Sequence, residues 1–218
     1  MQNIILTIAI YAIPAILAIT LHEAAHGYAA KQLGDPTAYM LGRVTLNPIR
    51  HIDPVGTVLI PGLLLLGSLI SGASGILFGW AKPVPVNFGR LRNPKTDMVL
   101  VALAGPASNL LQAIVWVLLI RFLVVPMPEG LAQQVFFETA SAGVSVNLML
   151  MAFNLIPILP LDGGRILEGL LPYRLAASYA QLERYGMIIM IILIASGLLN
   201  VFITPFLRLG SWILELFL

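Results

Sequence analysis

Long apolar stretches alternate with short polar ones along the chain, and this pattern predicts membrane-spanning helices. The apolar stretches cover residues 4–33, 55–78, 98–125, 140–161 and 186–203. Each is close to or above the roughly 20 residues that a helix needs to cross the hydrocarbon core of a bilayer. We therefore predict an all-α polytopic membrane protein, a helical bundle of about five membrane segments that forms a single domain over residues 1–218.

Composition supports the bilayer as solvent and narrows the possible chemistry. The 218 residues are 59% hydrophobic and only 10% charged, whereas soluble domains carry about 25% charged residues. The net charge of +2 and the lack of a long basic tract argue against a nucleic-acid partner. No basic region or cleavage site of a signal peptide is apparent, so we expect the first segment to be retained as a helix. Because the chain has no cysteine, a metal would have to be bound by His, Asp or Glu.

The second apolar segment, residues 55–78, differs from the others because glycine, serine and proline interrupt it. It leads into residues 79–87, GWAKPVPVN, whose alternating valines and prolines are typical of an extended edge strand. If the segment enters and leaves on one side, ten of the twelve Lys and Arg residues collect on that side. The positive-inside rule makes that side cytoplasmic. We therefore expect a short re-entrant or β-strand element in a multi-pass protein of the cell membrane.

The motif HEAAH, residues 22–26, lies in the second half of the first apolar segment. On a helix, His22 and His26 face the same side one turn apart and can share a metal, while Glu23 can act as a general base. Ionisable groups at membrane depth cost about 2.5–3.5 kcal/mol each, which argues against a chance occurrence. A catalytic zinc takes three protein ligands. Asp162 is the candidate for the third, because the charge pattern places it on the same side as HEAAH.

Other interpretations of these polar residues stay open. Asp162 precedes two glycines and is also the type of residue found in a turn. His51 lies in a polar loop and is expected to be structural or to face a substrate. Gly105 and Asn109 form a small face on the third segment, and helix packing is the expected role for both.

Three motifs together resemble the site-2 protease family of intramembrane zinc metalloproteases. They are HEAAH, ALAGPASN at residues 102–109 and NLIPILPLDGG at residues 154–164. GRVTLNPIRHIDPVGT and GWAKPVPVN further resemble its small prokaryotic subgroup without PDZ or CBS domains. The resemblance implies hydrolysis of peptide bonds in transmembrane protein or peptide substrates. It also implies one Zn²⁺ ion held by His22, His26 and Asp162, with Glu23 as catalytic base and Asn154 binding the substrate carbonyl or the developing oxyanion.

Physical reasoning agrees with this role for Asn154 and suggests how a substrate is held. A carboxamide in a helix unwound by Pro157 and Pro160 can point into a cavity and donate to an oxyanion; alternatively, it satisfies carbonyls that the prolines leave free. Residues 41–46 and 84–87 are candidate edges to which an unwound substrate could add as a strand. Because water must reach the zinc, we expect the active site to open toward the cytoplasmic side.

Two rival functions use the same residues. A proteolytically silent relative would bind membrane proteins without cutting them, but it would not need the base Glu23. A metal-ion transporter would need a polar pathway, and the last segment offers only Ser196 and Asn200. The sequence does not indicate the substrate, a regulatory partner or the oligomeric state.

Overall fold

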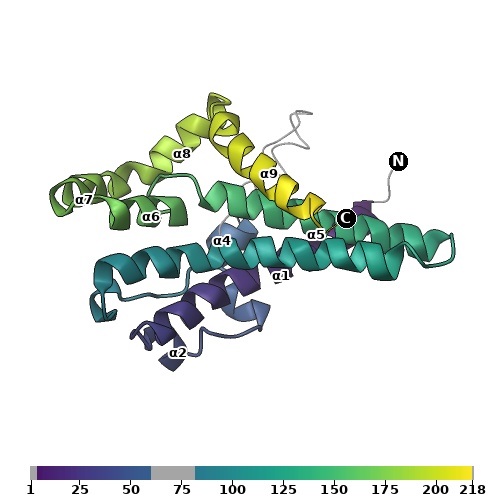
Figure 1. Cartoon of the computed structure of the whole chain (residues 1–218), viewed down its shortest axis with the longest axis horizontal. Coiled ribbons are helices and arrows are strands. Elements are labelled where there is room, and N and C mark those ends of the chain that lie inside the picture. The colour runs from purple at the N-terminus through teal and green to yellow at the C-terminus, as the bar shows by residue number, and fades with distance from the viewer. Residues whose placement is uncertain (1–3, 60–81, 218) are drawn as a thin grey trace.

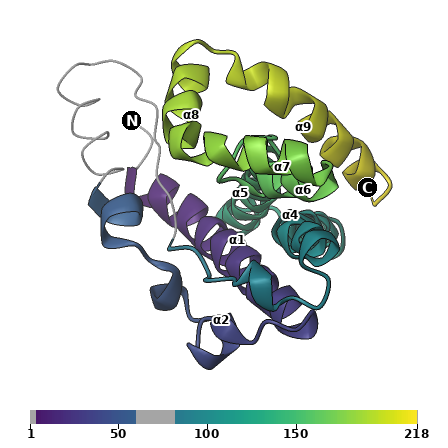
Figure 2. The same cartoon turned by 90° about the vertical axis from the view of Figure 1, so that its left-hand side faces the viewer.

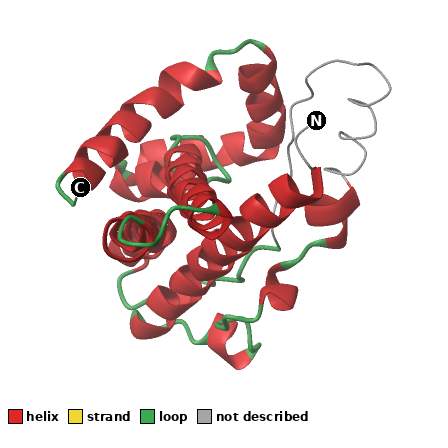
Figure 3. Ribbon diagram, turned by 90° about the vertical axis from the view of Figure 1, so that its right-hand side faces the viewer, coloured by secondary structure: helices red, strands yellow, loops and turns green. Residues whose placement is uncertain are grey.

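The computed structural model describes residues 4–59 and 82–217, and these residues form helices joined by loops, with no strand among them (Figure 3). The long helices are α1 (Ile4–Gln32), α4 (Pro94–Leu119), α5 (Leu131–Asn154), α8 (Gly186–Ala195) and α9 (Leu199–Glu215). The shorter ones are α2 (Thr37–Met40), η1 (Pro48–His51), η2 (Pro54–Leu59), η3 (Phe88–Arg90), η4 (Ile120–Val124), α6 (Asp162–Leu170), α7 (Tyr173–Ala180) and η5 (Gln181–Tyr185).

Four helical stretches in the described part of the chain are long and apolar enough to cross a membrane. They are Ala9–Gln32, Pro94–Val124, Leu131–Asn154 and Tyr173–Ala195. The predicted all-α polytopic membrane fold is therefore confirmed. The predicted segment 55–78 and its re-entrant path fall mostly on residues 60–81, which lie outside the described residues.

Helix α1 matches the predicted first segment to within one residue at its C-terminal end. The chain leaves the helix at Gly34, which has a left-handed φ of 114° that glycine adopts without strain, and Pro36 follows. Arg92 then donates its backbone N–H to the carbonyl of Leu33 at 3.0 Å. The start of α4 thus lies beside the end of α1.

Helix α5 is displaced from the predicted fourth segment, residues 140–161, by several residues at each end. It begins at Leu131, before the predicted start. Gln133, Gln134 and Glu138 lower the local hydropathy there, which hides the first turns from a hydropathy pattern, but they do not interrupt the helix. It ends at Asn154, since the prolines at 157 and 160 lack the N–H that would continue it.

The predicted fifth segment, residues 186–203, is two helices. Gly197, at a φ of 72°, ends α8, and α9 folds back along α5 (Figures 1 and 2). The close approach depends on Gly210, where a Cβ atom would lie 2.6 Å from the Cδ2 atom of Leu148. The C-terminal helix α9 therefore packs against α5.

The centre of the molecule is a packed group of three helices, in which α1 contacts both α4 and α5 and α4 also contacts α6. Figure 2 shows α4 and α5 nearly end-on, with α1 crossing beside them. Small buried side chains at their contacts, including Ala18, Ala102, Ala113 and Ala152, allow the backbones to approach closely. The start of α4 and helices α2, α6 and α7 gather at one end (Figure 1). This end carries the polar residues that the sequence analysis selected.

Candidate metal centre

The structure brings His22, His26 and Asp162 together. The two histidines lie one turn apart on α1, and Asp162 is the first residue of α6. His22 Nε2 lies 3.3 Å from Asp162 Oδ2, and His26 Nε2 lies 3.3 Å from Asp162 Oδ1. The two Nε2 atoms are 3.1 Å apart. In the described part of the chain, these residues form the one group of three such side chains whose ligand atoms all lie within 4.8 Å of one another.

The local sequence explains why Asp162 is held at this point. After α5 ends, residues 155–161 turn back with Ile156 and Leu159 buried. A Cβ atom at Gly163 would collide with the backbone of Leu155, and one at Gly164 would lie 2.5 Å from the backbone nitrogen of Leu159. Only glycines let the first turn of α6 lie against the preceding turn. The two glycines that suggested a simple turn therefore allow the close packing that places Asp162 next to α1.

His26 is oriented by the backbone of α4. Its Nδ1 atom lies 2.8 Å from the carbonyl oxygen of Val101, which can only accept a hydrogen bond. Nδ1 therefore carries the proton, and in the neutral ring the lone pair is on Nε2, on the side of Asp162. His22 has an equivalent contact to a side chain, since its Nδ1 atom lies 2.6 Å from Asn109 Oδ1. A hydrogen bond of this kind orients a histidine that binds a metal.

Gly105 supplies the space in which the two imidazole rings lie. A Cβ atom at this position of α4 would collide with both His22 and His26. Helix packing is the role expected from the sequence for Gly105 and Asn109, and that expectation missed their contacts with the candidate ligands. Their spacing of four residues could have suggested a shared face toward α1, but no sequence signal specified the histidines.

The donor set fits zinc. Two imidazole nitrogens and one carboxylate are a ligand set of catalytic zinc sites, which keep a further position open. Both Nδ1 atoms are already bonded on the far side of the rings, so both Nε2 atoms are available. The Oδ2 atom of Asp162 is buried and has no hydrogen-bond partner among the described residues. A cation between these three side chains would provide that carboxylate with a partner.

Glu23 is held by a hydrogen bond from the segment 82–87, which connects to the start of α4. The backbone N–H of Val84 donates to Glu23 Oε2 at 2.7 Å. The guanidinium of Arg43 donates to the carbonyl of Lys82 at 2.9 Å, and Asp35 accepts from the backbone N–H of Asn87 at 2.6 Å. The segment is thus bonded at both ends and to Glu23 in between. Lys82 also donates its backbone N–H to the carbonyl of His51 at 2.9 Å, but residues 82–87 do not form the strand ladder that an edge strand would show.

The other two predicted residues have separate surroundings. Asn154 is the last residue of α5, and its Nδ2 atom donates to the carbonyl of Leu150 in the same helix at 3.0 Å. Its catalytic role stays a prediction. His51 is buried in η1, where its Nε2 atom lies 3.0 Å from the carbonyl oxygen of Thr45. This contact agrees with the structural role expected for it.

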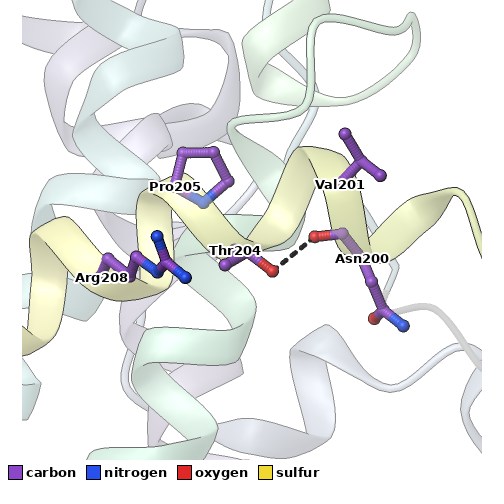
Figure 4. A pocket seen from close by; sticks show the side chains of 5 residues that line it. All are labelled: Asn200, Val201, Thr204, Pro205 and Arg208. Atoms are coloured by element: carbon purple, nitrogen blue, oxygen red, sulfur yellow. Dashed lines mark hydrogen bonds between the residues drawn. The ribbon is translucent and has the colours of Figure 1, made fainter.

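An open pocket of about 580 Å³ lies on α9, apart from the ligands. It is lined by Asn200, Val201, Thr204, Pro205 and Arg208 (Figure 4). The Thr204 hydroxyl donates to the carbonyl of Asn200, which is a bond within one helix. The pocket includes none of the three candidate ligands, so the candidate chemistry lies between α1, α4 and α6.

Comparisons with known proteins agree with this metal centre. Residues 124–197, which include Asp162, match the family model described as Peptidase family M50. Over 211 residues the chain is 41% identical to "Putative zinc metalloprotease YwhC" of Bacillus subtilis, and the match covers 94% of this chain and 89% of YwhC. The chain belongs to peptidase family M50. The resemblance to site-2 proteases is therefore confirmed, and the family names imply zinc.

More distant M50 relatives extend the comparison. The chain is 28% identical over 186 residues to "Putative zinc metalloprotease Rip2" of Mycolicibacterium smegmatis, a match that covers 85% of this chain and 66% of Rip2. The Rip2 protein of Mycobacterium tuberculosis strain H37Rv is 27% identical over 187 residues, with the same coverage. No solved structure matches the chain. The four apolar helical stretches and the M50 membership together indicate a multi-pass membrane protein.

Proposed function

We propose that this M50 protein is an intramembrane zinc metalloprotease that hydrolyses peptide bonds of transmembrane protein or peptide substrates. The observation that carries the proposal is the convergence of His22, His26 and Asp162. The two histidines and Glu23 lie on a helix long and apolar enough to span a bilayer. Ionisable groups at such depth are costly and mark functional sites. Their arrangement suits hydrolysis, because three protein ligands leave an open position for water on a catalytic metal, and a neighbouring carboxylate can take a proton from that water.

The residues divide the reaction between them. His22, His26 and Asp162 would hold one zinc ion, which would supply Lewis-acid activation of water and of the substrate carbonyl. Glu23 takes a proton from the attacking water as the new C–O bond forms. It then delivers that proton to the amide nitrogen as the C–N bond breaks. Because the backbone N–H of Val84 holds Glu23 Oε2, the other carboxylate oxygen is left for proton transfer.

Asn154 is our proposed donor to the substrate carbonyl oxygen. Its amide now bonds to the carbonyl of Leu150, so substrate binding would have to exchange that partner for the substrate. Its place at the last residue of α5, before the turn that leads to Asp162, supports the assignment. A preorganised amide donor of this kind stabilises a developing oxyanion.

We further propose that the site opens toward the cytoplasmic side of the cell membrane. Ten of the twelve Lys and Arg residues, all except Arg121 and Arg208, fall in the polar connections that we assign to one side of the membrane. The positive-inside rule assigns such a side to the cytoplasm. The contact between Arg92 and Leu33 supports this arrangement, because it places the basic ends of α1 and α4 together.

The test compares the wild type with Glu23→Gln in liposomes that contain single-span substrates tagged at both ends. Both proteins are checked for bound zinc, so that the loss of the base is separated from the loss of the metal. We expect the wild type to cut inside the membrane segment and Glu23→Gln, with the same zinc content, to leave the substrates whole. Equal cleavage by both would contradict the mechanism. Substrates captured but left whole by the wild type would instead favour a silent relative.

A further inference from the structure

Two fully buried asparagines lie behind His22. Asn109 belongs to α4 and Asn147 to α5, and neither side chain is exposed. Asn109 Nδ2 donates to Asn147 Oδ1 at 2.9 Å. An amide buried without hydrogen-bond partners would be costly. Each hydrogen bond of this pair therefore determines whether the neighbouring group acts as donor or as acceptor. Helix packing alone does not require two carboxamides here.

The orientation of both amides follows from groups that can only accept. Asn147 Nδ2 donates to the carbonyl of Gly143 at 2.9 Å, so Asn147 presents Oδ1 to Asn109. Asn109 must therefore present its NH₂ group to Asn147. The same NH₂ group also donates to the carbonyl of Ala18 at 3.3 Å. The reverse orientation of Asn109 would place its oxygen against two other acceptors.

The orientation of Asn109 in turn determines the tautomer of His22. Asn109 Oδ1, which can only accept, lies 2.6 Å from His22 Nδ1. Nδ1 therefore carries the proton, and in the neutral ring the lone pair is on Nε2, the atom that faces His26 and Asp162. His26 reaches the same state through the carbonyl of Val101. Of the two histidines, it is His22 whose tautomer depends on side chains.

We propose that Asn147 is a positioning residue of the metal centre, which acts through Asn109 to hold His22 in the Nδ1–H tautomer that presents Nε2 to the metal. The hydrogen bonds join α1, α4 and α5, so they also fix the rotation of α1 against its neighbours. The inference deepens the proposed function and rests on it for the identity of the ion. The tautomer itself follows from the protein contacts alone.

The first variant is Asn147→Leu, which keeps the branched shape of the side chain and removes the amide. Asn109 is then free to turn, and His22 loses its fixed acceptor. Zinc affinity, measured by competition with a chelator in detergent, should fall about 10–100-fold, as it does when such supporting hydrogen bonds are removed. Met151→Leu is the matched control, because Met151 is buried one turn further along α5 in an apolar cluster. It should keep the affinity of the wild type.

A second substitution separates positioning from packing. Asn109→Asp in the Asn147→Leu background gives His22 a carboxylate, which accepts from Nδ1 in either orientation, at the loss of the bond to the Ala18 carbonyl. The double variant should recover zinc affinity relative to Asn147→Leu. Wild-type affinity in Asn147→Leu would overturn the proposal. So would a loss that Asn109→Asp does not restore, because lost packing would not be rescued by a buried charge.

The imidazole ¹⁵N shifts of labelled wild type provide a readout other than zinc affinity. The chain has three histidines, so single substitutions assign the signals. In zinc-free protein at a pH where the rings are neutral, His22 should show a protonated Nδ1. A protonated Nε2 would overturn the proposal. Zinc binding without proteolysis would contradict the proposed function and leave this inference standing.

Discussion

The three-helix core of α1, α4 and α5 and the C-terminal pair α8 and α9 differ in whether asparagine side chains are buried and bonded between helices. In the core, Asn109 and Asn147 are fully buried, and their hydrogen bonds link helices and reach His22, a candidate metal ligand. In the C-terminal pair, Ser196 and Thr204 bond to carbonyls of their own helices, and Asn200 is exposed. Burial of an amide is costly unless its hydrogen bonds are satisfied. Buried polar groups bonded between helices thus mark the part of the molecule where chemistry is expected.

Glycines show the same contrast between the two regions. Gly105 of α4 leaves space for two imidazole rings, whereas Gly210 of α9 leaves space for the apolar ends of Leu148 and Met151. The same residue type therefore serves the metal centre in one region and helix packing in the other. Substitutions at these and related positions should separate metal binding from stability.

The largest effect is expected from Gly105→Ala. The added methyl group would overlap both His22 and His26, so the two Nε2 atoms could not keep their positions. Zinc affinity should fall by at least about 100-fold, the upper range for changes beside a ligand, and proteolysis should be lost. Gly130→Ala is the control, because nothing lies within 4 Å of a Cβ atom there. Wild-type zinc affinity in Gly105→Ala would contradict the assigned contact.

Gly27→Ala should impair the base without removing the metal. A Cβ atom at Gly27 would lie 2.8 Å from Val44 Cγ2 and 3.0 Å from Val84 Cγ1. Val84 would be displaced, and its backbone N–H holds Glu23. Displacement of a catalytic group by about 1 Å can cost about 100-fold in rate, so we expect turnover to fall about 10–100-fold at unchanged zinc content. A parallel loss of zinc would mean that the segment supports the ligands instead.

Asp35→Asn should reduce stability in a way that depends on pH. Burial by itself would raise the pKa of Asp35, but hydrogen bonds from Thr37 and from the backbone N–H of Asn87 outweigh it and lower the pKa below its ordinary value. The carboxylate therefore stabilises the fold above the pKa of the unfolded chain, and this contribution is lost as the pH falls through the lowered folded pKa. At neutral pH the variant should lose about 1.5–3 kcal/mol.

Denaturant unfolding in detergent, at neutral and at acidic pH, measures this difference in the free energy of unfolding. The difference between wild type and Asp35→Asn should shrink on acidification. A difference of the same size at both pH values would show that the charge of Asp35 is not what anchors Asn87.

The smallest effect is expected from Gly210→Ala in the C-terminal pair. Its methyl group would lie 2.6 Å from Leu148 Cδ2 and 3.1 Å from Met151 Cε, which are flexible ends that can shift. Crowding of this kind costs about 1–3 kcal/mol, and the better helix propensity of alanine offsets up to about 1 kcal/mol of it. Unfolding should become slightly easier while zinc affinity is unchanged. Loss of zinc in this variant would break the distinction between the two regions.

The sequence predicted the elements whose signals are local. The end of α1 was predictable because Gly34 and Pro36 stop a helix. The grouping of His22, His26 and Asp162 was predictable because ionisable residues are rare in apolar segments. The start of α5 was predicted too late because Gln133, Gln134 and Glu138 are polar, and the sequence does not show that they belong to the same helix as the apolar residues that follow. The division of residues 186–203 into α8 and α9 depends on the left-handed backbone at Gly197, which glycine permits but does not require.

The hydrogen bonds that orient the candidate ligands could not be predicted, because they depend on how α1, α4 and α5 pack against one another. Asn109 and Asn147 are 38 positions apart, and each alone is compatible with ordinary packing. Their bond exists only once α4 and α5 are docked, and its link to His22 only once α1 crosses both. Gly105 likewise gains its meaning from the two rings that lie against it.

Zinc-edge X-ray absorption of the purified protein, together with its metal content, tests the central claim most directly. The account predicts one zinc ion per chain, bound by two imidazoles and a carboxylate, and a marked loss of zinc in Asp162→Ala. A zinc shell without imidazole, or the same zinc content in Asp162→Ala as in the wild type, would contradict the metal centre described for His22, His26 and Asp162.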